Sequence, residues 1–431
     1  MRGIVALALF VSACGGILRA GTPDAQDNWM ALHAKAVDAI GRKDLQEALA
    51  LLTRCGELAQ TPVEIGVAAN DRGLALLQTG QLKEARQSLL KALDIWKTTQ
   101  DTDGRFAQTS VILAEVDRDL GDYAPAEQQL RDALAKIPAS EPLKGANLEA
   151  KALALDDLGD LLREEGRAAE ARLLLAEVGR LNGVSWRRVA EADVALAELD
   201  GDAHKWDEST AEWNEVIDLA HTHSDSGLEA VANRGIGQAW LDRGDPARAA
   251  PLLRSALATF ESNPSANAGQ FAPTLTCLAQ LYMGENKLAL AEDALTKALN
   301  EDERMLGNTN PQVAVVLEML GDTLSRRNQM ELARQHLDRA AHIIAGTFGE
   351  QSTLTGAAFA SWGVIEERAN YPARAAELFQ KALGLIRPGA DTTSNTLRLT
   401  VLRHYAEVLK ATHHKQEANA VLAQVKGFSE R

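Results

Sequence analysis

One spacing pattern recurs along almost the whole chain of 431 residues. A small residue is followed after twelve positions by a second small residue, and four positions later by a large one. The first small residues are Ala36, Gly73, Ala114, Gly159, Ala197, Gly237, Ala279, Gly321, Gly363 and Ala406. The large residues sixteen positions after them are Leu52, Leu89, Leu130, Leu175, Trp213, Leu253, Leu295, Leu337, Phe379 and Leu422. Because this internal spacing is constant in all ten units, the chain grows by adding units and not by enlarging one core.

Each unit is predicted to be a pair of antiparallel helices. In the second helix, residues such as Ala85, Leu89 and Ala92 fall at i, i+4 and i+7, on one helical face. Small side chains at the crossing let the two helices approach closely. Short polar turns containing Gly, as at 78–81 and 242–245, separate the helices. The composition agrees, because only 4% of residues are aromatic and the apolar residues are mainly helix-forming Ala and Leu.

This pattern resembles the tetratricopeptide repeat (TPR), which has small residues at the two helix-crossing points. The resemblance covers residues 24–427 and implies an all-α fold, a right-handed α-solenoid superhelix of about ten helix hairpins. Most units are spaced near 42 residues, which is similar to the kinesin-light-chain subtype. The region near 180–210 is expected to be irregular, residues 261–270 are a candidate joint, and residues 428–431 are expected to be a tail.

The N-terminal segment, residues 1–23, has the pattern of an export signal. Arg2 precedes an uncharged run from Ile4 to Leu18, which is too short to cross a bilayer as a helix. The run Val11-Ser12-Ala13-Cys14 resembles the lipobox of bacterial lipoproteins, in which Cys14 would carry the lipid. The chain is therefore expected to be exported and periplasmic or envelope-anchored in a bacterium, with Cys14 as its only membrane contact. The alternatives are a simple cleaved signal or an apolar tail on a cytoplasmic protein.

The sequence contains no motif typical of catalysis or of cofactor binding. It has no Gly-rich phosphate loop, nucleophile elbow, paired-Cys motif or metalloprotease helix. His221, His223 and Asp225 form the nearest approach to a metal-binding group, but they lie in a predicted turn with no clear further ligand. The net charge of −15 disfavours binding to nucleic acid. We therefore expect no enzyme activity, no metal and no cofactor.

Function is expected to lie on the surface of the first helices. The TPR resemblance implies that these helices line a concave groove that holds a peptide or a partner helix. Residues three before, one after and four after the first small residue, with adjoining charged residues, are expected to face this groove and to be solvent-exposed. The candidates are Glu115, Asp119, Asp156, Asp160, Arg163, Glu164, Glu318 and Asp322. The alternative interpretation is a solvated helix face with no partner.

The candidate groove residues lean acidic. Asp156, Asp160 and Glu164 are spaced by four residues and therefore share one helix face, where like charges repel. The predicted partner is a protein or peptide with basic segments. The predicted function is a non-catalytic protein–protein interaction scaffold, and the alternative is an intracellular regulatory module that controls a separate effector. The spacing pattern leaves the oligomeric state open.

Overall fold

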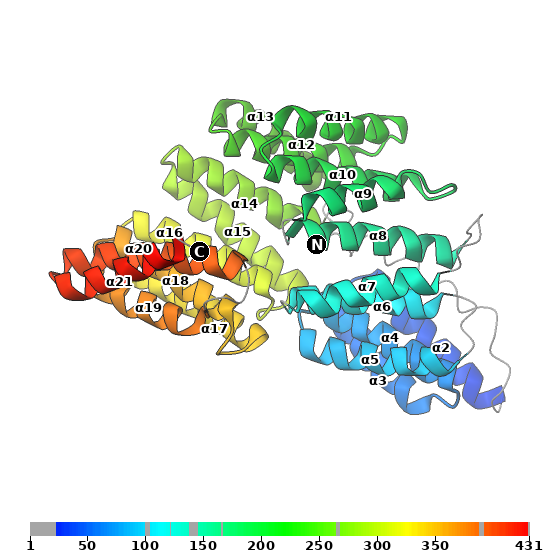
Figure 1. The fold of residues 1–431 in the computed structure, drawn as a ribbon. Helices are drawn as coiled ribbons and strands as arrows, with labels where there is room; N and C mark the ends of the chain where they lie inside the picture. The colour runs from blue at the N-terminus through cyan, green and yellow to red at the C-terminus, as the bar shows by residue number, and fades with distance from the viewer. Residues whose placement is uncertain are drawn as a thin grey trace. The chain divides into compact units, whose positions relative to one another are not determined.

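The computed structural model describes residues 23–99, 104–120, 122–137, 145–164, 167–263, 268–387 and 392–429. Over these residues the chain is a succession of α-helices without a strand (Figure 1), which confirms the predicted all-α fold. The predicted signal segment up to residue 22, including Cys14, lies outside the described residues. The last helix continues to Ser429, so the predicted tail begins later than residue 428. No helix in the described part of the chain combines the length and apolarity that a bilayer span requires.

The chain divides into two compact units. Unit 1 comprises Met1–Gln270 and unit 2 comprises Phe271–Arg431. The boundary coincides with the end of the joint that the sequence predicts at 261–270. Each unit is a series of helix hairpins in which a first helix is followed by an antiparallel second helix.

Unit 1 contains six hairpins among its described residues. The first helices are α2 (Pro23–Gly41), α4 (Pro62–Gln78), α6 (Arg105–Asp119), α8 (Ala146–Glu164), α10 (Trp186–Asp202) and α12 (Ser226–Asp242). The second helices are α3 (Leu45–Leu58), α5 (Leu82–Thr98), α7 (Tyr123–Lys136), α9 (Ala168–Val178), α11 (Trp206–Thr222) and α13 (Pro246–Ser262). Each first helix packs against the second helix of its own hairpin and against neighbouring hairpins.

Unit 2 continues the same arrangement. Its first helices are α14 (Ala268–Gly284), which begins just before the unit boundary, α16 (Pro311–Arg326), α18 (Thr353–Arg368) and α20 (Thr392–Ala411). Its second helices are α15 (Leu288–Leu306), α17 (Met330–Phe348), α19 (Pro372–Leu385) and α21 (Lys415–Ser429).

Local capping explains where several first helices begin. At the start of α4, the Thr61 hydroxyl accepts a hydrogen bond from the Glu64 backbone N–H at 3.2 Å. The Glu64 carboxylate accepts one from the Thr61 N–H at 3.0 Å, which completes a capping box. At the start of α16, the Asn310 side chain accepts from the Gln312 N–H at 2.8 Å, and Pro311 occupies the first helical position.

The residues of the repeat pattern meet at the helix crossings. A Cβ atom added to Gly237 would lie 2.8 Å from Leu253 Cγ, and one added to Gly363 would lie 2.6 Å from Phe379 Cε1. Both distances are shorter than real Cβ contacts, so the helices approach as closely as glycine permits. The predicted crossing register of small and large residues is therefore confirmed.

In the eight hairpins where the residue seven positions after the first small residue is described, the residue at that position has positive φ. Gly80 and Gly244 occupy it with φ of 72° and 74°. In unit 2, Asn286, Asn328 and Asn370 take the same left-handed conformation, which Asn tolerates better than most residues. This recurring conformation reverses the chain between the two helices.

The prediction of an irregular region near 180–210 is wrong for the fifth hairpin. Helices α10 and α11 each contain 17 residues, and Gly201 lies inside α10. Ser209 fits the crossing because its hydroxyl donates a hydrogen bond of 2.7 Å to the Ala197 carbonyl. The large Trp213 ring fits because Gly235, on the next first helix, has no side chain to collide with it.

Candidate functional site

Three neighbouring first helices of unit 1 bring charged side chains together. We call Glu115 and Arg118 of α6, Asp157 and Asp160 of α8, and Arg188 of α10 the first-helix cluster. Helix α8 packs against both α6 and α10, which places these residues on adjacent elements. The cluster joins three residues at positions that the repeat spacing predicts, Glu115, Arg118 and Asp160, to Asp157 and Arg188, which the spacing does not predict.

The electrostatics of the first-helix cluster are dominated by partly buried carboxyl groups. Burial raises the pKa of Asp157 to about 7. The nearby Glu115 and Asp160 carboxylates also raise the pKa of Asp157, because like charges oppose its ionisation. The guanidinium groups of Arg118 and Arg188 lower that pKa and offset part of the repulsion.

The pKa values of the carboxyl groups on α6 are also raised. Burial raises the pKa of Glu115, and the neighbouring Asp119 carboxylate raises it further while Arg118 lowers it. Burial also raises the pKa of Asp119, against the opposing charge of Arg118. Ionising these neighbouring, partly buried carboxyl groups is energetically unfavourable. A positive charge placed beside them would make the ionisation more favourable.

The predicted solvent exposure is wrong for two residues of α8. Asp156 is 4% exposed and Asp160 is 7% exposed, because the flanking first helices α6 and α10 cover this part of α8. Arg163 closes over Asp160, with 3.7 Å between Nε and the carboxylate. Glu164 is the last residue of α8, and its side chain is outside the described residues.

Arg163 links α8 to α10 through two carboxylates. Its guanidinium lies 3.3 Å from the Glu198 carboxylate and also pairs with Asp202. This predicted groove residue is therefore engaged within the chain, where it holds neighbouring first helices together.

The two remaining candidates, Glu318 and Asp322, lie in unit 2 on α16. Burial raises the pKa of Glu318 to about 7, although a side-chain hydrogen bond with Ser361 of α18 opposes the shift. Asp322 pairs with Arg326 at 2.9 Å and with Arg368 of α18. In unit 2, the acidic residues of the first helix α16 thus contact polar and basic residues of the neighbouring first helix α18.

A second polar network connects the first helices at the N-terminal side of unit 1. The His33 ring of α2 lies 2.7 Å from the Asp71 carboxylate of α4. Asn70 donates to Asp71 at 3.0 Å and accepts a hydrogen bond of 2.8 Å from the Thr109 hydroxyl of α6. Thr109 in turn accepts from the Trp96 indole at 3.0 Å. These bonds satisfy buried polar groups and fix the relative positions of α2, α4 and α6.

Three carboxylates in the fifth hairpin approach one another closely enough to share a cation. Oxygens of Asp193, Glu212 and Glu215 all lie within 4.8 Å of one another. Burial and the two glutamates raise the pKa of Asp193 to about 7. Acidic groups often cluster without a metal, and no further ligand group joins them among the described residues, so we assign no metal here.

The histidine group considered as a metal site has structural contacts instead. His223 stacks on Trp186 with ring centroids 4.0 Å apart. Asp225 caps α12 by accepting from the Leu228 N–H at 3.0 Å, and it pairs with Arg187 at 2.8 Å. These contacts agree with the interpretation of His221, His223 and Asp225 as polar turn residues.

Comparison with known sequences agrees with the helix-crossing geometry. The sequence model of the tetratricopeptide repeat matches residues 64–136 and 270–343. The first segment lies in unit 1, and the second lies in unit 2 except for its first residue. These two segments carry tetratricopeptide repeats. Among curated protein sequences, none matches it significantly.

Several solved structures are similar to this TPR chain. The crystal structure of Rap protein complexed with competence and sporulation factor has a TM-score of 0.50 at 12% identity, covering 85% of this chain and 98% of that one. BtubC (BKLC) from P. vanneervenii has a TM-score of 0.46 at 18% identity, covering 52% and 91%. TPR-like repeats of a Podosopora anserina kinesin light chain have a TM-score of 0.40 at 18% identity, covering 46% and 94%. At such identities the likeness concerns the fold alone.

The repeat spacing missed Asp157 and Arg188. The template predicted that the residue three before the small position faces the groove, but Val111 and Asp156 at that position are both buried. Asp157, one residue later, is only half-buried and takes part in the first-helix cluster. Taking the residue two before the small position, in place of three before, would have identified Asp157.

Proposed function

We propose that this TPR chain is a non-catalytic interaction scaffold and that the first-helix cluster of unit 1 binds a basic segment of a protein or peptide partner. The observation that carries the proposal is that the packed helices α6 and α8 bring the carboxyl groups of Glu115, Asp157 and Asp160 close together, and burial with the two neighbouring carboxylates raises the pKa of Asp157. A Lys or Arg side chain of the partner would supply the missing positive charge. Such complementarity chiefly increases association rate and specificity.

The charge state of the cluster gives the proposal a pH dependence. A partner cation favours the ionised carboxylates and therefore lowers the pKa of Asp157 from its value of about 7. Below that pH, Asp157 must lose its proton before the cation binds well, so affinity decreases. Binding is expected to strengthen as the pH increases from about 6 to about 8.

A second candidate function is an intracellular regulatory module that senses a peptide and controls a separate effector. The likeness to Rap protein, which was crystallised with competence and sporulation factor, favours this alternative. Cell fractionation separates the two candidates. Recovery of the chain in the cytosol with residues 1–14 intact would contradict an envelope location and support the regulatory module.

The proposed location is the bacterial envelope, with Cys14 as the lipid-bearing residue. The support for it is the uncharged N-terminal run followed by Val11-Ser12-Ala13-Cys14. Cys14→Ser is expected to release the chain from membranes or to block its processing. Cys55→Ser is the matched control, because this buried cysteine lies in α3 of the folded unit. Unchanged membrane association of Cys14→Ser would contradict lipidation.

Affinity capture with matched baits tests the scaffold function. The wild-type chain, Glu115→Gln/Asp157→Asn and the control Glu84→Gln/Glu208→Gln are incubated with extract from the native cells. The control residues are exposed acids on second helices. We expect a partner that the wild type and the control retain and the cluster variant loses. Identical sets of captured proteins for all three baits would contradict a role for the first-helix cluster.

A further inference from the structure

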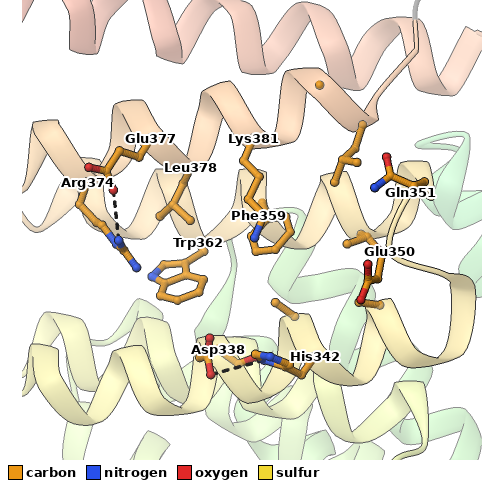
Figure 2. Close-up of a pocket in the computed structure, with 15 residues that line it drawn as sticks. Asp338, His342, Glu350, Gln351, Phe359, Trp362, Arg374, Glu377, Leu378 and Lys381 are labelled. Carbon is orange, nitrogen blue, oxygen red and sulfur yellow. Dashed lines mark hydrogen bonds and ion pairs between the residues drawn. The ribbon is translucent and has the colours of Figure 1, made fainter.

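Unit 2 contains a groove between two successive second helices. This α17–α19 groove has a volume of about 670 Å³, which is within the range of ligand-binding sites. Its walls come from α17 and α19, and its floor comes from α18 (Figure 2). The charged residues that line it are Asp338 of α17, Glu350 of the following loop, and Arg374, Glu377 and Lys381 of α19, and His342 of α17 lies beside them.

The floor of the α17–α19 groove is apolar and held in place. Trp362 is 5% exposed, and its indole N–H donates to the Glu366 carboxylate at 3.1 Å. Glu366 is 0% exposed and accepts two further hydrogen bonds of 2.9 Å from Arg334. Because these bonds fix Trp362, the floor is formed before any ligand binds. Phe359 continues this apolar surface along the groove.

Most charged side chains of the groove have partners within the chain. His342 lies 3.4 Å from the Asp338 carboxylate on one wall. Arg374 lies 3.1 Å from the Glu377 carboxylate on the other wall. These pairs leave Lys381 and Glu350 as the charged lining residues that form no ion pair with the described part of the chain.

Lys381 is directed into the groove and not away from it. Its ammonium lies 3.6 Å from the centroid of the Phe359 ring, and Figure 2 shows the side chain descending from α19 onto that ring. The ring face accommodates the positive charge but is not a conventional hydrogen-bond acceptor, so the N–H donors of the exposed Lys381 remain available to a ligand carboxylate. Lys381 therefore presents hydrogen-bond donors beside an apolar floor.

The groove is elongated, which favours a chain over a compact ligand. The lining residues of α19 extend from Arg374 to Leu385. Eleven helical steps correspond to about 16 Å along the axis. An extended peptide of about five residues has a similar length. The Gln351 amide at one end can bond to the backbone of such a peptide.

We propose that the α17–α19 groove binds an extended peptide segment in which a bulky apolar residue adjoins Asp or Glu. The apolar side chain packs on Phe359, Trp362 and Leu378, and the carboxylate accepts hydrogen bonds from the Lys381 ammonium. Glu350 repels a second carboxylate at its end of the groove, so the acidic residue is restricted to the Lys381 region. This proposal is independent of the first-helix cluster, because it concerns another unit and a ligand of opposite charge.

A peptide array tests this proposal on the full chain. Random peptides of about five residues are probed with the wild type, with Lys381→Met and with Lys381→Arg. Met retains the apolar stem over Phe359 but has no N–H donor, whereas Arg restores the charge. The charge-matched control is Lys91→Met, at an exposed position on α5.

The wild type and Lys91→Met are expected to select peptides that pair Asp or Glu with Phe, Leu, Ile or Trp. Lys381→Met should bind those peptides about tenfold more weakly, as expected for loss of one charge-assisted hydrogen bond, and Lys381→Arg should recover most of the affinity. Basic peptides bound by the first-helix cluster should be unaffected. Failure to select acidic–apolar peptides, or equal affinity for them in Lys381→Met, would overturn the proposal.

Discussion

Gly73 of α4 lies directly against Leu89 of α5. A Cβ atom added to Gly73 would lie 2.6 Å from Leu89 Cγ and 3.3 Å from the Ala85 carbonyl oxygen. The contact joins the first small residue of a repeat to the large residue sixteen positions later. It therefore shows at atomic level why the spacing is constant along the chain.

Gly73→Ala is expected to destabilise the chain by about 1–3 kcal/mol, because the added methyl group forces α4 and α5 apart. The matched control is Gly56→Ala in α3, where an added Cβ meets nothing within 4 Å. There the substitution should be neutral or stabilising by up to about 1 kcal/mol through helix propensity. Urea unfolding monitored by circular dichroism measures both. Equal effects of the two substitutions would mean that the crossing is not tightly packed.

Ala333→Leu tests the second small position of a repeat in unit 2. Ala333 of α17 is completely buried at the crossing with α16, so the larger side chain is expected to cost about 1–3 kcal/mol of stability. Ala373→Leu places the same side chain at an exposed position of α19 and should change stability by less than about 0.5 kcal/mol. Thermal unfolding of the two variants distinguishes these outcomes. If Ala373→Leu were destabilised and Ala333→Leu were not, Ala333 would not lie at the crossing of α16 and α17.

The stability of the folded chain is expected to depend on pH because of Asp302 in α15. It is 3% exposed, and burial together with the Glu301 charge raises its pKa from 3.8 to about 7. The folded chain thus holds this proton more tightly than the unfolded chain, and stability decreases as the pH increases from about 4 to about 7.

Asp302→Asn removes that ionisation and should stabilise the chain at about pH 8 by on the order of 1–4 kcal/mol. The gain should shrink towards pH 4, where the wild-type carboxyl is already protonated. Asp218→Asn, at an exposed position of α11, is the control and should show no such dependence. Melting temperatures across this pH range give the comparison. A constant difference between Asp302→Asn and wild type would refute the assignment.

The helix hairpins could be predicted from the sequence because the crossing contacts depend on residues within one repeat. Gly73, Ala85 and Leu89 are separated by fixed spacings, and these spacings alone place them at one crossing. The turn conformation was only partly predictable. Gly80 indicated a turn directly, whereas Asn328 adopts the same positive φ without glycine.

The exposure of site residues could not be predicted in the same way, because it depends on contacts between repeats. Asp156 has the spacing of a groove residue, yet the adjacent first helices cover it. Asp157 belongs to the site because of Glu115 on α6 and Arg188 on α10, and neither neighbour follows from the periodicity of α8. The α17–α19 groove likewise depends on how successive second helices are spaced across α18.

Binding of a basic segment to the first-helix cluster is tested most directly by isothermal titration of the captured partner into wild type and Glu115→Gln/Asp157→Asn. We predict that wild-type affinity increases between about pH 6 and about pH 8 and decreases as added salt shortens the screening length to below about 8 Å. The amide variant should bind at least about tenfold more weakly at the higher pH and lose the pH dependence. Equal affinities of wild type and variant, unaffected by pH and by salt, would contradict the proposed role of the cluster.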